Sequence, residues 1–250
     1  MLRLKRLLVF TLFAMCAITA FSFWATRQPG ADAGGALSPP PRAGAELDTL
    51  SAGITTAVNV TQSPDAQWLT QAAARTGIPA RALQAYVAAA VRANDSAPAC
   101  GIGWNTVAAV GAVESGHGTY GGSSLNTAGQ ATGPIVGPSL NGVGFAAIPD
   151  TDAGALDGDA RWDHAVGPMQ FIPSTWELAG RDGNGDGTAD PFNIDDAALS
   201  AATYLCAHGR DLSTAQGWTD AVYAYNQSDP YIRQVRTQAK AYAVKAGTAE

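Results

Sequence analysis

Residues 104–118 read Trp-Asn-Thr-Val-Ala-Ala-Val-Gly-Ala-Val-Glu-Ser-Gly-His-Gly, and this stretch sets the character of the chain. Its three valines recur at helical spacing, which predicts a mostly apolar helix from about Trp104 to Ser115. Glu114 stands at the end of that helix, where partial removal from water disfavours its anion and raises its pKa, as a general acid working near neutral pH requires. The glycines that follow end the helix and leave room for a substrate. On this stretch alone, the better interpretation of Glu114 is an ordinary exposed Glu at the end of a helix.

Helical segments dominate the sequence on both sides of this stretch. Asp65 is a suitable N-cap for a helix over 66–76, Gly77 ends that helix, and Pro79 opens the next one. Apolar spacing and helix-breaking residues predict further helices over 80–94, 173–179, 194–208, 219–226 and 229–246. Residues 116–160 are rich in Gly and Pro and are predicted to be loops, and such a long irregular stretch is often functional. No segment alternates strongly enough to demand a strand, so the predicted fold class is mainly α-helical with long irregular loops.

The N-terminal segment carries a signal for export. Arg3, Lys5 and Arg6 precede an uncharged stretch over 7–26, a pattern typical of a cleavable signal peptide or of a single membrane anchor. Residues 27–63 are rich in Gly, Ala, Pro, Ser and Thr and are predicted to form a flexible linker. We therefore expect a signal peptide or anchor over 1–26, a linker over 27–63 and a folded domain over 64–247, located in the cell envelope or secreted.

Charge and cysteine content indicate which partners to expect and in which compartment the domain folds. The chain has a net charge of −6, and three of its 15 basic residues stand at the extreme N-terminus, so nucleic-acid binding is not expected. Export places the domain in an oxidising compartment, where Cys100 and Cys206 are expected to form a disulfide. The alternative is a pair of buried free thiols.

Two further runs combine polar and aromatic side chains suited to carbohydrate. The run Gly-Pro-Met-Gln-Phe-Ile-Pro-Ser-Thr-Trp over 167–176 places turns on both sides of an apolar strip, and Gln170 within it can donate and accept hydrogen bonds. Tyr225 and Asn226 close a predicted helix with an aromatic face and an amide. Each feature has a structural alternative, because Gln170 can satisfy backbone groups and Tyr225 with Asn226 can pack and cap a helix end.

In their order along the chain, these motifs resemble a known enzyme family. The context Val-Glu-Ser-Gly-His-Gly over 113–118, the run over 167–176, an Asp/Asn/Gly loop and Tyr-Asn-Gln-Ser-Asp-Pro-Tyr over 225–231 occur in this order in lytic murein transglycosylases of the membrane-bound B type, most of all in actinobacterial members. The resemblance covers about residues 65–242. It implies a lysozyme-like helical domain with a substrate cleft.

The resemblance also implies the chemistry. Glu114 would be the single catalytic acid/base, and Gln170, Tyr225 and Asn226 match positions that line the family's cleft. Such enzymes cut the β-1,4 bond between N-acetylmuramic acid and N-acetylglucosamine in peptidoglycan and release a 1,6-anhydromuramyl end. The expected partners are the peptidoglycan glycan strands and, through the N-terminal segment, a membrane.

Two other functions stay open on the sequence. A hydrolytic muramidase needs a second carboxylate near the bond, and Asp163, in the Trp-Asp-His run before Gln170, is a candidate that we take as structural by default. A non-catalytic peptidoglycan-binding module needs neither carboxylate. The combination of Glu114 with an amide and aromatic set favours an enzyme.

The run Asp-Gly-Asn-Gly-Asp-Gly-Thr over 182–188 predicts a calcium loop. Oxygen-bearing side chains alternate at positions 1, 3 and 5 with Gly at 6, as at the start of an EF-hand, but position 12 is Asn193 in place of Glu. The family resemblance places the last ligand farther on. The expected ligands of a structural Ca²⁺ are Asp182, Asn184, Asp186, Thr188 and Asp196. The alternative is a metal-free Asx/Gly turn.

Overall fold

The computed structural model describes residues 65–247, and the fold is mainly α-helical, as predicted. The predicted signal peptide or anchor over 1–26 and the linker over 27–63 lie outside the described residues. None of the helices within 65–247 is both long and apolar enough to cross a membrane. The helices are α2 (Ala66–Thr76), α3 (Ala80–Ser96), α4 (Trp104–Ser115), α5 (Pro173–Ala179), α6 (Ile194–Leu205), α7 (Ala215–Tyr225) and α8 (Asp229–Gly247).

Capping residues fix the ends of the first helices, as the sequence predicts. The Asp65 carboxylate accepts the N–H of Gln67 at 3.0 Å, and Gly77 ends α2 in the left-handed region at φ 77°. The central helix α4 spans the predicted residues. Gly116, at φ 60°, ends it by donating its N–H to carbonyls of the last turn.

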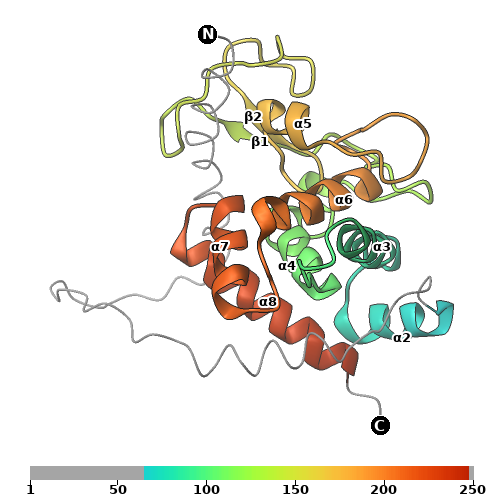
Figure 1. Cartoon of the computed structure of the whole chain (residues 1–250). Helices are drawn as coiled ribbons and strands as arrows, with labels where there is room; N and C mark the ends of the chain where they lie inside the picture. Colours follow the sequence, from blue (N-terminus) through green and yellow to red (C-terminus); the bar gives the residue numbers. More distant parts are fainter. Residues whose placement is uncertain (1–64, 248–250) are drawn as a thin grey trace, which may run out of the picture.

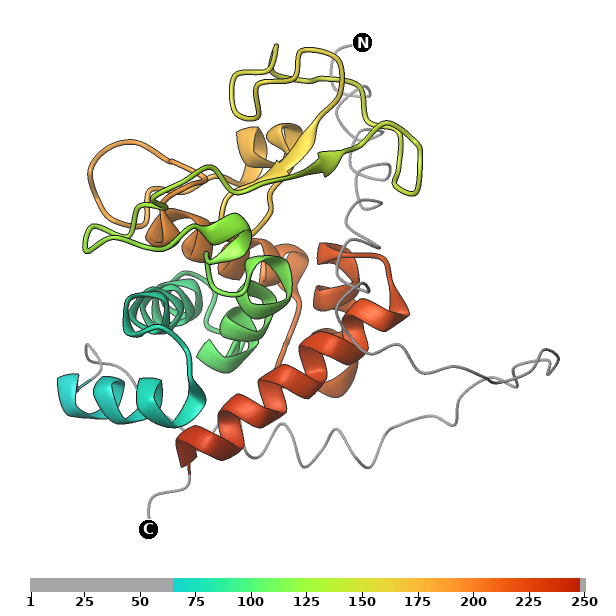
Figure 2. The same cartoon turned by 180° about the vertical axis from the view of Figure 1, so that it is seen from behind.

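The central helix α4 forms the middle of the core. Its residues Val107, Ala108, Ala109 and Val110 have no exposed surface. The helix packs against α3, α6 and α8, and Figures 1 and 2 show it enclosed by them. A helix surrounded in this way is apolar on nearly every side, which explains the Ala/Val-rich sequence.

A small antiparallel sheet is an element that the sequence did not predict. Strand β1 (Val136–Ser139) pairs with β2 (His164–Val166), and the register shifts between their two ends. Strands of three or four residues are too short to show an alternating pattern, so they escape a search for periodicity. In Figure 1 the sheet and the long loops around it lie at one end of the molecule, and α2 lies at the other.

Three helix ends differ from the predicted ones by two residues or more. Helix α3 continues to Ser96, two residues past the predicted end. Helix α6 ends at Leu205, before the predicted 208, and a short 3-10 turn, η2 (Ala207–Gly209), follows with His208 at φ 61°. Helix α7 begins at Ala215, before the predicted 219, because the Thr214 hydroxyl caps it by accepting the N–H of Gly217 at 3.1 Å.

The predicted disulfide between Cys100 and Cys206 is confirmed. Their Cα atoms lie 5.4 Å apart, and the residues are 106 positions apart in the sequence. The bond ties the segment after α3 to the end of α6. These two helices already make the most extensive helix–helix contact in the domain.

Replacing both cysteines by serine is expected to lower the free energy of unfolding by about 2–4 kcal/mol, because a cross-link over so long a loop restricts the unfolded chain. Urea unfolding of the wild-type and double-serine proteins, followed by circular dichroism, measures the difference. An unchanged free energy of unfolding would show that the cross-link adds nothing to stability.

Candidate active site

The structure places Glu114 in the last turn of α4, facing the start of α8. Its carboxylate oxygen Oε1 accepts a hydrogen bond of 2.6 Å from the hydroxyl of Tyr231, which is itself almost fully buried. Helices α4 and α8 pack closely along their lengths. The carboxyl group therefore sits at a helix–helix contact and is partly buried, and the exposed-Glu reading of the sequence is wrong.

Burial favours the protonated form of this carboxyl group, which is the form that a general acid needs. Desolvation raises the pKa of Glu114 to about 8, and the hydrogen bond from Tyr231 lowers it by a smaller amount. Burial, and next the nearby Glu114 charge, raise the pKa of Tyr231 well above 10, so its hydroxyl remains a donor. At neutral pH the Glu114 side chain is mostly protonated and able to give up a proton.

Ser115 joins the end of α4 to the run over 167–176. Its hydroxyl donates to the Pro168 carbonyl at 2.6 Å and accepts the N–H of Gly118 at 2.8 Å. The residue is buried. This pair of bonds fixes the position of the 167–170 turn relative to the neighbouring Glu114.

The 167–170 turn has an unusual backbone that presents Gln170. Gly167 adopts φ 76°, and a Cβ atom on it would lie 1.8 Å from the Pro191 carbonyl oxygen, so only glycine fits. Gln170 itself has φ 51°, and its amide nitrogen donates to the Gly167 carbonyl at 3.0 Å. The Gln170 side chain lies against Gly137 of β1 and remains partly exposed. A substrate can therefore reach it.

Tyr225, which is partly exposed, and the buried Asn226 come at the end of α7, next to this turn. The Tyr225 hydroxyl donates to the Met169 carbonyl at 2.7 Å, and its ring packs edge-on against Phe171. Its pKa is raised well above 10 by burial and then by the Glu114 charge, which places it near the carboxyl group. Asn226 is 1% exposed, so its side chain lies beneath the surface that a sugar would touch.

A buried histidine ties three helices together next to Glu114. His117 makes hydrogen bonds through Nδ1 with the Tyr86 hydroxyl of α3 (3.2 Å) and through Nε2 with the Tyr242 hydroxyl of α8 (2.8 Å). Burial lowers the pKa of His117 to about 4, so the ring is neutral at physiological pH. The contact holds the end of α4 between its neighbours.

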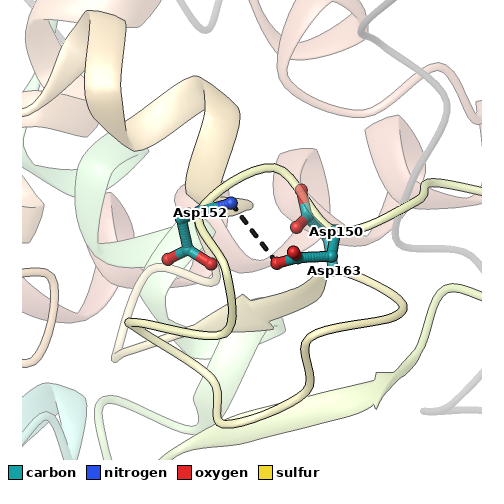
Figure 3. Close-up of side chains that lie close together, drawn as sticks. All are labelled: Asp150, Asp152 and Asp163. Atoms are coloured by element: carbon teal, nitrogen blue, oxygen red, sulfur yellow. Dashed lines mark hydrogen bonds between the residues drawn. The ribbon is translucent and has the colours of Figure 1, made fainter.

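Asp163 is a structural residue in the described fold. It has no exposed surface, and its two oxygens accept hydrogen bonds from the backbone N–H (2.9 Å) and hydroxyl (2.7 Å) of Thr151. It clusters with Asp150 and Asp152, and Figure 3 shows the three side chains on their loop. Its carboxylate therefore holds this loop together.

The 182–188 loop is folded around its acidic side chains. The Asp182 carboxylate accepts the N–H groups of Gly185 (2.6 Å) and Gly187 (2.8 Å). Asp196 is fully buried and accepts three N–H groups, from Gly183, Asn184 and Asp190. Among the described residues, three acidic ligand atoms come within 4.8 Å of one another at Asp150, Asp152 and Asp163, and this loop shows no such group.

Sequence reasoning missed three residues of the site: Tyr231, Ser115 and His117. Tyr231 ends the quoted run over 225–231, so its presence in that run was the available signal. Its contact with Glu114 joins residues 117 positions apart, and only the crossing of α4 and α8 creates it. Ser115 and His117 follow Glu114 in the run over 113–118 and carried no separate signal.

Comparison with known proteins matches part of the chain to a protein family. The family model described as Transglycosylase SLT domain matches residues 147–241, a segment that holds Gln170, Tyr225 and Tyr231 and excludes Glu114. Comparisons with curated proteins and with solved structures give no match. Together with the mainly helical, lysozyme-like fold, the family match indicates a lytic transglycosylase that acts on peptidoglycan.

Proposed function

We propose that this enzyme cleaves the β-1,4 bond between N-acetylmuramic acid and N-acetylglucosamine and forms 1,6-anhydromuramyl ends, with Glu114 as its single acid/base. The observation that carries the proposal is the partly buried Glu114 carboxyl group, whose pKa is raised to about 8 and whose oxygen is held by Tyr231. The resemblance to the membrane-bound B type adds support. We propose in addition that the N-terminal segment anchors the enzyme to a membrane, from which it reaches its cell-wall substrate.

One carboxyl group is enough for this reaction. Protonated Glu114 gives its proton to the glycosidic oxygen as the bond to the anomeric carbon breaks, and the acetamido group of the sugar stabilises the positive centre. The carboxylate then takes the proton of the muramic 6-hydroxyl, whose oxygen attacks the anomeric carbon within the same sugar. Glu114 ends the cycle protonated, and no water is consumed.

The sugar is bound, in this proposal, by the surface around the 167–170 turn. Gln170 is partly exposed and offers an amide to the hydroxyl or acetamido groups of the sugar. The exposed part of Tyr225 adds an aromatic surface. Asn226, which is buried, supports these groups from beneath.

Two alternatives are less well supported. A hydrolytic muramidase uses two carboxylates that flank the bond. Asp163, the candidate for the second one, is buried and bonded to Thr151. A non-catalytic binding module leaves unexplained why a carboxyl group is kept in a position that raises its pKa.

Glu114→Gln is expected to lower the rate of peptidoglycan cleavage by roughly 10³-fold, because the amide keeps the shape of the side chain and cannot donate a catalytic proton. Mass spectrometry of the digested strands measures both rate and chemistry. Anhydro ends weigh one water less than reducing ends. Reducing ends from the wild-type enzyme would contradict the transglycosylase reaction, and full activity of the variant would contradict the role of Glu114.

A stability measurement on the same pair checks that the variant is folded. The pKa of Glu114 is raised from 4.5 to about 8 on folding, so the unfolded chain ionises first and the folded state loses stability as pH rises through this window. Gln does not ionise. The melting temperature of Glu114→Gln should therefore exceed that of the wild type by a margin that grows from pH 4 to pH 8.

Tyr231→Phe is expected to move the alkaline limb of the kcat/KM profile to higher pH, by on the order of one unit. The Tyr231 hydrogen bond lowers the pKa of Glu114, so its loss keeps the carboxyl group protonated to higher pH. Tyr242→Phe is the matched control, because that hydroxyl lies on the same helix and bonds to His117. A limb that stays in place for Tyr231→Phe would refute the link between the two side chains.

We also propose a structural Ca²⁺ in the 182–188 loop, held by Asp182, Asn184, Asp186, Thr188 and Asp196. The donor set fits a hard cation, since it consists of carboxylate, amide and hydroxyl or carbonyl oxygens. The loop has alternating Asx turns, in which Asn184 accepts the Asp186 N–H at 2.8 Å and Asp186 accepts the Thr188 N–H at 2.9 Å. A bound cation would offset the repulsion among these acidic groups.

Adding Ca²⁺ at about 100 times its dissociation constant is expected to stabilise the fold by about 2.7 kcal/mol. Thermal unfolding with Ca²⁺ and with a chelator measures the shift. Asp186→Asn should reduce it, and Asp152→Asn, in the other acidic cluster, should leave it unchanged. A melting temperature that does not respond to millimolar Ca²⁺ would exclude the site.

A further inference from the structure

The 167–170 turn, which presents Gln170, packs against the backbone of the buried Pro191. Gly167 has no side chain, and no room is left between its α-carbon and the Pro191 carbonyl group. The Gly167 carbonyl in turn accepts the side-chain amide of Gln170 at 3.0 Å. The position of the Gln170 amide therefore depends on where the chain places Pro191.

Gln170 needs support of this kind because its backbone conformation is unfavourable. It lies at φ 51°, in the left-handed region that is uncommon for residues other than glycine. Such a conformation persists only where the surrounding structure fixes it, and it is often found at functional sites. Loss of a supporting contact would let the turn relax and would move the amide that we assign to the sugar.

Asp190 fixes the segment that contains Pro191. Its carboxylate oxygen Oδ1 accepts the N–H of Phe192 at 2.8 Å, which closes a turn around Pro191. Its backbone N–H donates to the carboxylate of the buried Asp196, in α6, at 2.9 Å. Asp190 is therefore bonded both to its own turn and to the helix that follows.

The other carboxylate oxygen of Asp190 bonds to a distant part of the chain. Oδ2 accepts the side-chain amide of Gln130 at 2.9 Å, across 60 positions in the sequence. Beside this contact the Ala131 N–H donates to the Phe192 carbonyl at 3.0 Å. The contact joins the loop after the catalytic helix α4 to the segment against which the 167–170 turn packs.

We propose that Asp190 and Gln130 are positioning residues for substrate binding. Their contact holds the 167–170 turn in the conformation that presents Gln170 to the sugar. The inference rests on the proposed function, because it takes Gln170 as a residue that binds the sugar. Neither residue takes part in the hydrogen bond to Glu114, so loss of their contact weakens binding and leaves the chemical step intact.

Gln130→Glu tests the proposal, because it keeps the size of the side chain and sets a second carboxylate against Asp190. The variant is expected to raise KM for peptidoglycan strands about tenfold and to leave kcat within about twofold. Asp190→Asn combined with Gln130→Glu should recover most of this loss, because the Asn amide donates to the Glu carboxylate and the contact returns with its roles exchanged.

Gln216→Glu is the matched control. Gln216 donates its amide to the Asp220 carboxylate at 2.8 Å, so the change sets two carboxylates against each other in the same way. This pair lies in the first turns of α7, at the opposite end of the helix from Tyr225. KM is expected to stay at the wild-type value.

A double-mutant cycle with Gln170→Ala separates positioning from a general disturbance of the fold. If the contact acts through Gln170, Gln130→Glu weakens binding much less once the Gln170 amide is absent. Binding is measured by cosedimentation with insoluble peptidoglycan, using proteins that also carry Glu114→Gln so that the polymer is not cut. Melting temperatures show which variants fold, and Gln130→Ala, which adds no charge, takes the place of Gln130→Glu if the latter unfolds.

Four results would overturn the inference. They are an unchanged KM for Gln130→Glu, no recovery in the double variant with Asp190→Asn, a loss of the same size in the Gln170→Ala background, and an equal loss for Gln216→Glu. None of them bears on the acid/base. The proposed function fails separately if Glu114→Gln keeps full activity or if the products carry reducing ends.

Discussion

The hydrogen bond between Glu114 and Tyr231, made where α4 meets α8, is the constraint on which the site depends. A carboxyl group buried without a partner is costly, and one that is well solvated has an ordinary pKa. The Tyr231 hydroxyl satisfies one oxygen while the apolar end of α4 keeps water away. The result is a carboxyl group that stays protonated at neutral pH and still gives up its proton readily.

Much of the surrounding structure serves to hold this contact. His117 links the end of α4 to Tyr86 and Tyr242 on the two neighbouring helices. Ser115 bonds to the 167–170 turn at Pro168, and Tyr225 bonds to the same turn at Met169. Gln170 therefore has a fixed position relative to Glu114, although no hydrogen bond joins the two directly. A rigid setting of this kind is what the positioning of a proton donor requires.

The sequence predicted the helices and the partial burial of Glu114 well, because both depend on neighbouring residues in the chain. Asp65 and Gly77 mark helix ends through their own backbone neighbours, and the apolar run before Glu114 foretells its desolvation. The short strands β1 and β2 could not be predicted, because their pairing depends on the loop around them. Tyr231 was missed for the same reason, because its contact with Glu114 exists only where α4 and α8 cross. Asn226 was predicted to line the cleft. In the structure it is buried where α7 ends and α8 begins, which local sequence did not indicate.

The most direct test of this account is the pKa of Glu114 itself, measured by NMR. The chain contains four Glu residues, so a sample labelled with ¹³C at the glutamate carboxyl carbons gives few signals, and the one lost in Glu114→Gln identifies the residue. A titration midpoint near 8 is the result expected from a desolvated carboxyl group held by a phenol. A midpoint near the ordinary value of 4.5 would show a solvated carboxylate and contradict the account.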